Sequence, residues 1–101
     1  MSQSFHATLL AERRRFILDI LNLSSPPKLN HRCLAVVLEQ YGLRPADAAL
    51  RSDLRWLFER GLITIEYLDN ILIAALTQRG RDASADRLRV DGVSRDGIPD
   101  A

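Results

Sequence analysis

The sequence has little cysteine: Cys33 is the only one among 101 residues. One thiol excludes an intramolecular disulfide and a zinc site built from several cysteines. His31 lies two positions before Cys33 on an expected helix, so the two side chains point in different directions and make a poor metal pair. We therefore expect no metal site, and we place Cys33 near the core as a small residue.

The sequence also lacks long apolar runs. No stretch approaches the roughly 18 residues of a membrane span, and the N-terminus has neither a basic leader before a hydrophobic block nor a small-residue cleavage site. Hydrophobic residues make up 47% and charged residues 27% of the chain, which is ordinary for a globular protein. The sequence predicts one small cytoplasmic domain with no membrane contact.

The sequence also lacks an excess of either charge, because the formal net charge is only +1. Many nucleic-acid-binding proteins are strongly basic, so any basic surface here has to be local. The sequence contains no glycine-rich phosphate loop, serine nucleophile elbow or recognisable pair of carboxylates, and His6 is isolated. We expect no enzymatic activity, no cofactor and no small-molecule substrate.

Two helical patterns occupy the first half of the chain. Apolar residues recur at helical spacing over about 5–23, with Ser4 as N-cap, and over 31–41, with Asn30 as N-cap. The apolar face of the first helix is wider than the roughly 100° stripe of a one-sided surface helix. Either this helix has two neighbours within the domain, which is the simpler interpretation, or one side meets a second copy of the chain.

The first helix also carries three consecutive arginines, Arg13, Arg14 and Arg15. Consecutive helical residues point in different directions, so the three side chains do not share one face. We expect them to be solvated beside Glu12 and Asp19.

A third helix, a glycine and a hairpin follow one another over residues 44–76. Pro45 suits the first turn of a helix and Gly61 its end, and β-rich runs cover 62–68 and 71–76. A helix that passes directly into a hairpin is the centre of a winged helix-turn-helix. The sequence therefore predicts a mainly α fold with a small antiparallel β hairpin.

The hairpin alternates apolar and polar residues around a two-residue turn, Asp69-Asn70. One face is apolar and closes the core: Ile63, Ile65, Tyr67, Leu72, Ala74 and Leu76. The tip carries Glu66 and Asp69 and no Lys or Arg, whereas a wing that touches phosphates is normally basic.

A short final helix, capped by Thr77, ends the predicted winged-helix domain of residues 1–88. Residues 89–101 contain glycine, proline and mixed charge without periodicity. We expect them to form a flexible C-terminal tail.

The expected third helix has an apolar and a polar face. The apolar face packs on the first two helices and consists of Leu50, Leu54, Leu57 and Phe58. The outward face carries Ala48, Ser52, Arg55, Trp56 and Glu59, with Arg51 at its edge. Small residues and two arginines on an outward face suit a helix that enters the major groove of DNA. In the alternative interpretation, the arginines only form surface ion pairs with acidic residues of the same helix: Asp47, Asp53 and Glu59.

Trp56 points about 140° away from the centre of the apolar face. It therefore either contacts a partner or covers the hairpin or the tail. Packing within the chain is the preferred interpretation, because a large aromatic side chain seldom stays fully exposed.

Four segments carry a resemblance to a known family: KLNHRCL, LRSDLRWLFERGLITIE, LTQRGRD and RLRVDGVSRDGIP. Over almost the whole chain the sequence resembles small winged-helix proteins of Mu-like phages and prophages, described as uncharacterised or as arsenic-repressor-like regulators. The resemblance implies DNA binding through the third helix, with the recognition role on Arg44, Arg51, Ser52 and Arg55. Metal sensing is not implied, because the third helix lacks the closely spaced cysteines of arsenic repressors.

Two functions from different classes remain open. The first is a DNA-binding transcriptional regulator of phage genes, with double-stranded DNA as partner. The second is a winged-helix interaction module that binds a phage protein or a second copy of the chain and no DNA. Residues 28–70 carry six basic and six acidic side chains, which favours the second function, whereas the outward face of the third helix favours the first. We prefer the first.

Overall fold

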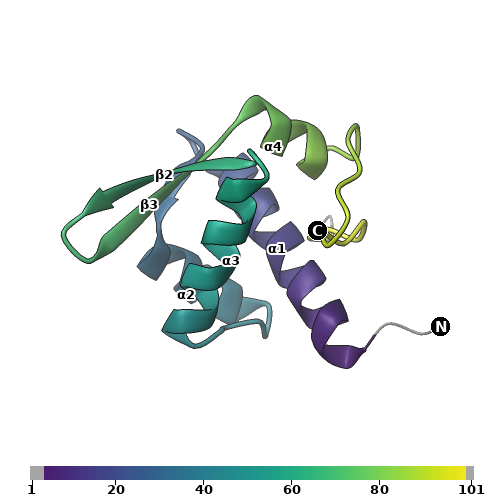
Figure 1. Cartoon of the computed structure of the whole chain (residues 1–101), viewed down its shortest axis with the longest axis horizontal. Helices are drawn as coiled ribbons and strands as arrows, with labels where there is room; N and C mark the ends of the chain where they lie inside the picture. Colours follow the sequence, from purple (N-terminus) through teal and green to yellow (C-terminus); the bar gives the residue numbers. More distant parts are fainter. Residues whose placement is uncertain (1–3, 100–101) are drawn as a thin grey trace.

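The computed structural model describes residues 4–99, in which four helices accompany a three-stranded antiparallel sheet (Figure 1). In chain order the elements are α1 (Phe5–Leu23), β1 (Lys28–Asn30), α2 (His31–Gln40), α3 (Asp47–Glu59), β2 (Ile63–Leu68), β3 (Ile71–Leu76) and α4 (Gln78–Ser84). The sheet order is β1-β3-β2, so the predicted hairpin gains a third strand that was too short to predict from propensity. The hairpin projects away from the helices.

The helix ends follow the predicted capping residues. The side chains of Ser4, Asn30 and Thr77 each accept a hydrogen bond from the backbone N–H three residues later, at 3.0, 2.9 and 3.0 Å. Gly42 and Gly61 both have a φ of +74° just beyond α2 and α3, the left-handed conformation that glycine adopts without a Cβ penalty. These residues fix where the helices begin and end.

The core surrounds α1, which lies against α2, α3, α4 and β3. Ile17, Leu18 and Leu21 of this helix are fully buried. Several neighbours within one domain account for the wide apolar face of α1 without a second copy of the chain.

Two predicted core residues lie outside the core. Phe58 is 50% exposed, because it points about 70° away from the buried leucines of α3. Cys33 is exposed on α2, because it points about 120° away from the buried pair Leu34 and Leu38.

The hairpin has the predicted turn and register. Asp69, with a φ of +54°, and Asn70 connect Leu68 to its partner Ile71. The pairs on the apolar face are Ile63–Leu76, Ile65–Ala74 and Tyr67–Leu72. Along β2, exposure rises from 1% at Ile63 to 62% at Tyr67. On β3 the apolar face stays buried as far as Leu72, the partner of Tyr67. The apolar face therefore closes the core along β3 and at the base of β2.

The prediction that the three arginines of α1 are solvated is wrong, since Arg13 and Arg15 are only 6% and 5% exposed. Arg13 Nε donates a hydrogen bond to the buried carboxylate of Asp53 on α3, and Arg14 Nε lies 3.5 Å from the other oxygen of that carboxylate. Burial lowers the pKa of Arg14, while Asp53 acts in the opposite direction. A partner 40 residues away leaves no periodic signal in the sequence, so the triplet resembled a surface run.

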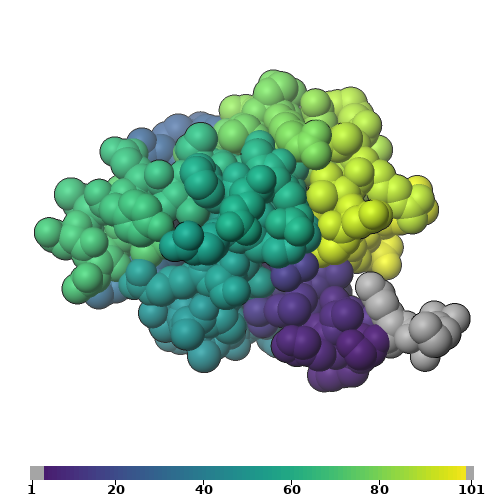
Figure 2. Space-filling view, in the orientation of Figure 1, coloured from purple at the N-terminus to yellow at the C-terminus, as the bar shows by residue number. Residues whose placement is uncertain are grey.

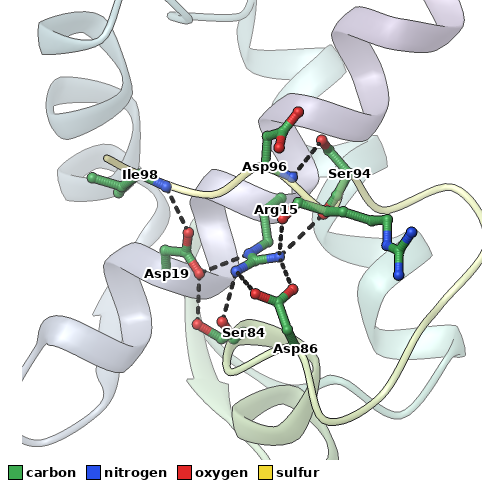
Figure 3. A network of polar contacts seen from close by, with 8 residues as sticks. Arg15, Asp19, Ser84, Asp86, Ser94, Asp96 and Ile98 are labelled. Carbon is green, nitrogen blue, oxygen red and sulfur yellow. Dashed lines mark hydrogen bonds and ion pairs between the residues drawn. The ribbon is translucent and has the colours of Figure 1, made fainter. Parts of the chain in front are cut away.

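Arg15 binds the segment that follows α4 (Figure 3). Its Nη1 donates to the carboxylate of Asp86 at 2.8 Å and to the carbonyl oxygens of Ser94 and Arg95 at 3.3 and 3.1 Å. Burial by itself would lower the pKa of Arg15, but the hydrogen bonds that it donates to its carboxylate partners outweigh that effect and raise its pKa. One α1 side chain thus anchors three points of the chain after α4: Asp86, Ser94 and Arg95.

Residues 89–99 differ from the expected flexible tail. Val90, Val93 and Ile98 pack against the core, and the N–H of Ile98 donates to the carboxylate of Asp19 at 2.9 Å. The segment lies beside α1 (Figure 1). Its anchors are single residues whose partners lie on a distant helix, so no periodicity marks them. Residues 100 and 101, also part of the expected tail, lie outside the described residues.

Replacing Asp53 tests the buried ion pair. Asp53→Ala leaves Arg13 and Arg14 without their carboxylate, so the free energy of unfolding should fall by about 3–5 kcal/mol in urea denaturation. Glu59→Ala, on the exposed side of α3, should stay within about 0.5 kcal/mol of the parent protein. Equal effects of the two substitutions would contradict the anchoring role of Asp53.

Removing the C-terminal segment tests its packing. A chain that ends at Leu88 loses the apolar contacts of three side chains and two acceptors of Arg15, the carbonyl oxygens of Ser94 and Arg95. Its melting temperature should therefore fall by more than about 5 °C. Arg89→Gln in the full chain changes an exposed residue of the same segment and should leave the melting temperature nearly unchanged. A truncated chain as stable as the full one would show that the segment does not contribute to the core.

Candidate nucleic-acid interface

A groove of about 330 Å³ separates the outward face of α3 from the hairpin. Its lining comes from both elements: Ala48, Arg51, Ser52, Arg55, Ile65, Tyr67 and Leu72. In the space-filling view, α3 occupies the middle of one face, with the hairpin on one side and the C-terminal segment on the other (Figure 2). Three of the four predicted recognition residues, Arg51, Ser52 and Arg55, therefore line one groove.

Arg55 and Ser52 are the free members of this group. Both are exposed, and Arg55 forms no ion pair with any residue from 4 to 99. Of the acidic neighbours proposed in the alternative interpretation, Asp53 is buried against Arg13. The guanidinium of Arg55 is available to a ligand in the groove.

Arg51 is held in place by its own domain. Its Nε donates to the carboxylate of Asp47 at 2.7 Å, and its Nη2 donates to the carbonyl oxygen of Asn70 at 2.8 Å. This hydrogen bond from Arg51 lowers the pKa of Asp47. Arg51 thus joins the first turn of α3 to the turn of the hairpin.

Arg44 lies outside the groove. It is exposed in the loop between α2 and α3, and its Nη1 donates to the carboxylate of Glu39 at 3.0 Å. It lines a separate hollow of about 320 Å³ that also contains Arg32. The structure does not bring Arg44 together with the other predicted recognition residues.

His31, the first residue of α2, contacts both α3 and the hairpin, the two elements that line the groove. Its side chain is 4% exposed, and its Nδ1 accepts a hydrogen bond from the N–H of Leu72 at 3.1 Å. Its Nε2 lies 3.3 Å from Arg51 Nη2 and 3.4 Å from the Asp47 carboxylate. Because Nδ1 is the acceptor, the proton of the neutral ring belongs on Nε2, toward Asp47. His31 therefore ties α2 to both walls of the groove.

Trp56 is half-buried beside the outward face of α3. The guanidinium carbons of Arg14 and Arg60 lie 4.0 and 3.7 Å from its ring centroid. A Cβ placed at Gly92 would approach the indole to 2.6 Å, so the C-terminal segment covers the ring closely. Of the predicted environments for Trp56, packing against the tail is the one that the structure has.

Comparisons with known proteins place the chain among phage proteins. It is 32% identical over 87 residues to a protein of Escherichia phage Mu described as uncharacterized protein gp26, and the match covers 86% of this chain and 91% of the phage protein. The chain belongs to the gp26 family. No family model matches it, and no solved structure matches it. Membership in the gp26 family agrees with the Mu-like phage resemblance of the sequence.

Two further properties of this gp26-family chain concern the described residues. Between residues 4 and 99 no helix is both long and apolar enough to cross a membrane. The same range contains no group of three or more His, Cys, Asp or Glu side chains that could hold a metal ion.

Sequence reasoning missed three parts of the site. The groove wall formed by Ile65 and Tyr67 depends on how the hairpin sits against α3, which no local pattern reveals. The role of His31 was missed because a lone histidine has no diagnostic spacing. Arg60 had a usable signal, since it follows Trp56 by four residues and residues so spaced are neighbours on a helix surface.

His31→Ala tests the support beneath the groove. The substitution removes the acceptor of the buried Leu72 N–H, so the free energy of unfolding should fall by about 1–3 kcal/mol, measured by urea denaturation. His6→Ala is the matched control, because His6 is exposed near the start of α1 and should change stability by less than about 0.5 kcal/mol. A His31 variant as stable as the control would contradict the proposed link.

Proposed function

We propose that this gp26-family chain is a winged-helix protein that binds double-stranded DNA through α3 and regulates transcription of phage genes. The element order supports the winged-helix assignment, since α2 and α3 follow one another through a short loop and β2–β3 follows directly. The similarity to a phage Mu protein supports the phage context. The proposal gives the chain no catalytic role and no cofactor.

The observation that carries the proposal is the composition of the outward face of α3. Ala48 and Ser52 are small and exposed, so they allow close approach of the helix to base edges. Arg55 lies on the same face and has no carboxylate partner between residues 4 and 99. A free guanidinium on a helix in the major groove suits a bidentate contact to O6 and N7 of guanine. Arg51 has a structural role, because its hydrogen bonds to Asp47 and Asn70 hold α3 against the hairpin.

A second candidate function rests on the tip of the hairpin. Tyr67 and Leu68 are each 62% exposed, and the acidic residues Glu66 and Asp69 accompany them. Exposed apolar side chains with acidic neighbours suit a protein partner better than a phosphate backbone. A phage protein or a second copy of the chain that binds this tip would make the chain an interaction module.

Arg55→Ala tests the DNA proposal. With the phage's own regulatory DNA in a fluorescence anisotropy titration, the substitution should weaken binding by about 1–3 kcal/mol and relax specificity at one base pair, because a bidentate guanine contact is lost. If Arg55 instead contacts a phosphate, all sequences should weaken alike and the salt dependence should become shallower by about one unit. The variant should remain folded, since the side chain is exposed.

Arg81→Ala is the control for Arg55→Ala, because Arg81 is an exposed arginine on α4. It should bind the DNA as the parent protein does. The proposal fails if the parent protein shows no salt-dependent binding, or if Arg55→Ala binds as tightly as Arg81→Ala. In either case the interaction module becomes the preferred function of the chain.

A further inference from the structure

The C-terminal end of α3 concentrates positive charge on the side of the helix away from the hairpin. Arg60 stacks on one indole, that of Trp56, at 3.7 Å from the ring centroid, and Arg14 stacks on the same ring at 4.0 Å. Arg79, from the first turn of α4, donates through Nε to the carbonyl oxygen of Arg60 at 2.9 Å. Two guanidinium groups therefore lie on one ring, and a third, that of Arg79, is bonded to the backbone of Arg60.

This charge is incompletely neutralised by the described chain. Within residues 4–99, neither Arg60 nor Arg79 forms an ion pair, and Arg60 Nη1 reaches only the carbonyl oxygen of Trp56 at 3.4 Å. Arg14 lies near Asp53, a carboxylate that Arg13 also binds, and its buried Nε has no hydrogen-bond partner. Arg60 and Arg79 are exposed, so both are accessible to a ligand from solvent.

The two exposed guanidinium groups are held in place before any ligand binds. A planar guanidinium on an indole is attracted by the ring and loses side-chain freedom. The indole itself is fixed from behind by the close contact with Gly92 and by Arg14, whose Nη1 donates to the Gly92 carbonyl oxygen at 3.2 Å. Arg79 is fixed by its bond to the end of α3. Preorganised donors of this kind bind an anion at little cost in conformational entropy.

The arginine cluster lies at the flank of α3 opposite the hairpin. A helix in the major groove lies between two phosphate backbones, and contacts to both fix its register. On the hairpin side the tip offers Glu66 and Asp69 and no cation, so it is poorly suited to bind phosphate. Arg60 follows the last residue of α3 and lies on Trp56, whose ring also contacts Arg14 of α1. Arg79 lies beside Arg60, to whose carbonyl oxygen it donates.

We propose that Arg60, positioned by Trp56, and Arg79, positioned by the carbonyl oxygen of Arg60, form a phosphate-binding site that contacts the DNA backbone on the flank of α3 opposite the hairpin. The inference rests on the proposed DNA-binding function and adds the source of its backbone contacts. In this arrangement the arginine pair replaces the basic wing that the sequence lacks. Arg14 is a positioning residue, because its side chain is only 14% exposed.

The test compares salt dependence across charge variants of the full chain. With the phage's regulatory duplex, Arg60→Gln and Arg79→Gln should each make the slope of log affinity against log salt shallower by about one unit. Affinity at 0.1 M salt should fall by roughly five- to tenfold for each arginine, because each released phosphate contact contributes a slope of about 0.9. Arg60→Lys keeps the charge and should keep the slope. Arg81→Gln, on the same helix as Arg79, should bind as the parent protein does.

The single tryptophan supplies an independent readout. Because Arg60 stacks on Trp56, addition of the duplex should change the tryptophan emission of the parent protein, and the Arg60→Gln Arg79→Gln double variant should lose most of that change. Circular dichroism melting checks that each variant is folded. If the two arginines only cap the end of α3, the variants will melt earlier and bind DNA with an unchanged salt slope, which overturns the inference and leaves the proposed function standing. Absence of any salt-dependent binding by the parent protein overturns both.

Discussion

Three consecutive arginines on α1 connect this helix to α3 and to the chain that follows α4. Arg13 pairs with Asp53 and so fixes the rotation of α3, whereas Arg15 holds Asp86 and the carbonyl oxygens of the segment after α4. Arg14, between them, lies against the indole of Trp56. Consecutive helical residues diverge by about 100°, which is why three neighbours in sequence reach three different parts of the fold.

This arrangement determines which side of α3 faces outward. Asp53 turns one flank of the helix toward α1, and Leu50, Leu54 and Leu57 fill the core, so the remaining face carries Ser52 and Arg55. Arg51 and His31 then set the distance between that face and the hairpin. The orientation of the proposed recognition surface thus depends on buried polar contacts. Their loss leaves charged or hydrogen-bonding groups without partners, which is more costly than the loss of a surface ion pair.

Much of the fold could be predicted from the sequence because its signals are local. Caps at Ser4, Asn30 and Thr77, the glycines after α2 and α3, and the alternation of the hairpin all act within a few residues. The outward face of α3 was likewise visible from helical periodicity. The buried arginines, the packed segment over 89–99 and the role of His31 were not visible, because each depends on a partner at least 20 residues away. Arginine, glycine and aspartate are typical of a protein surface or a flexible tail, so the composition of these stretches does not indicate packing.

The proposed function requires that α3 presents its outward face to DNA. Chemical-shift mapping tests it most directly: the phage's regulatory duplex is titrated into the isotope-labelled full chain, and the amide and arginine side-chain signals are followed. We expect perturbations concentrated on residues 48–60 of α3 and its C-terminal end, with little change at Leu68 and Asp69 on the hairpin tip, which do not line the groove. Perturbations concentrated on the tip, or none at saturating duplex and low salt, would contradict it.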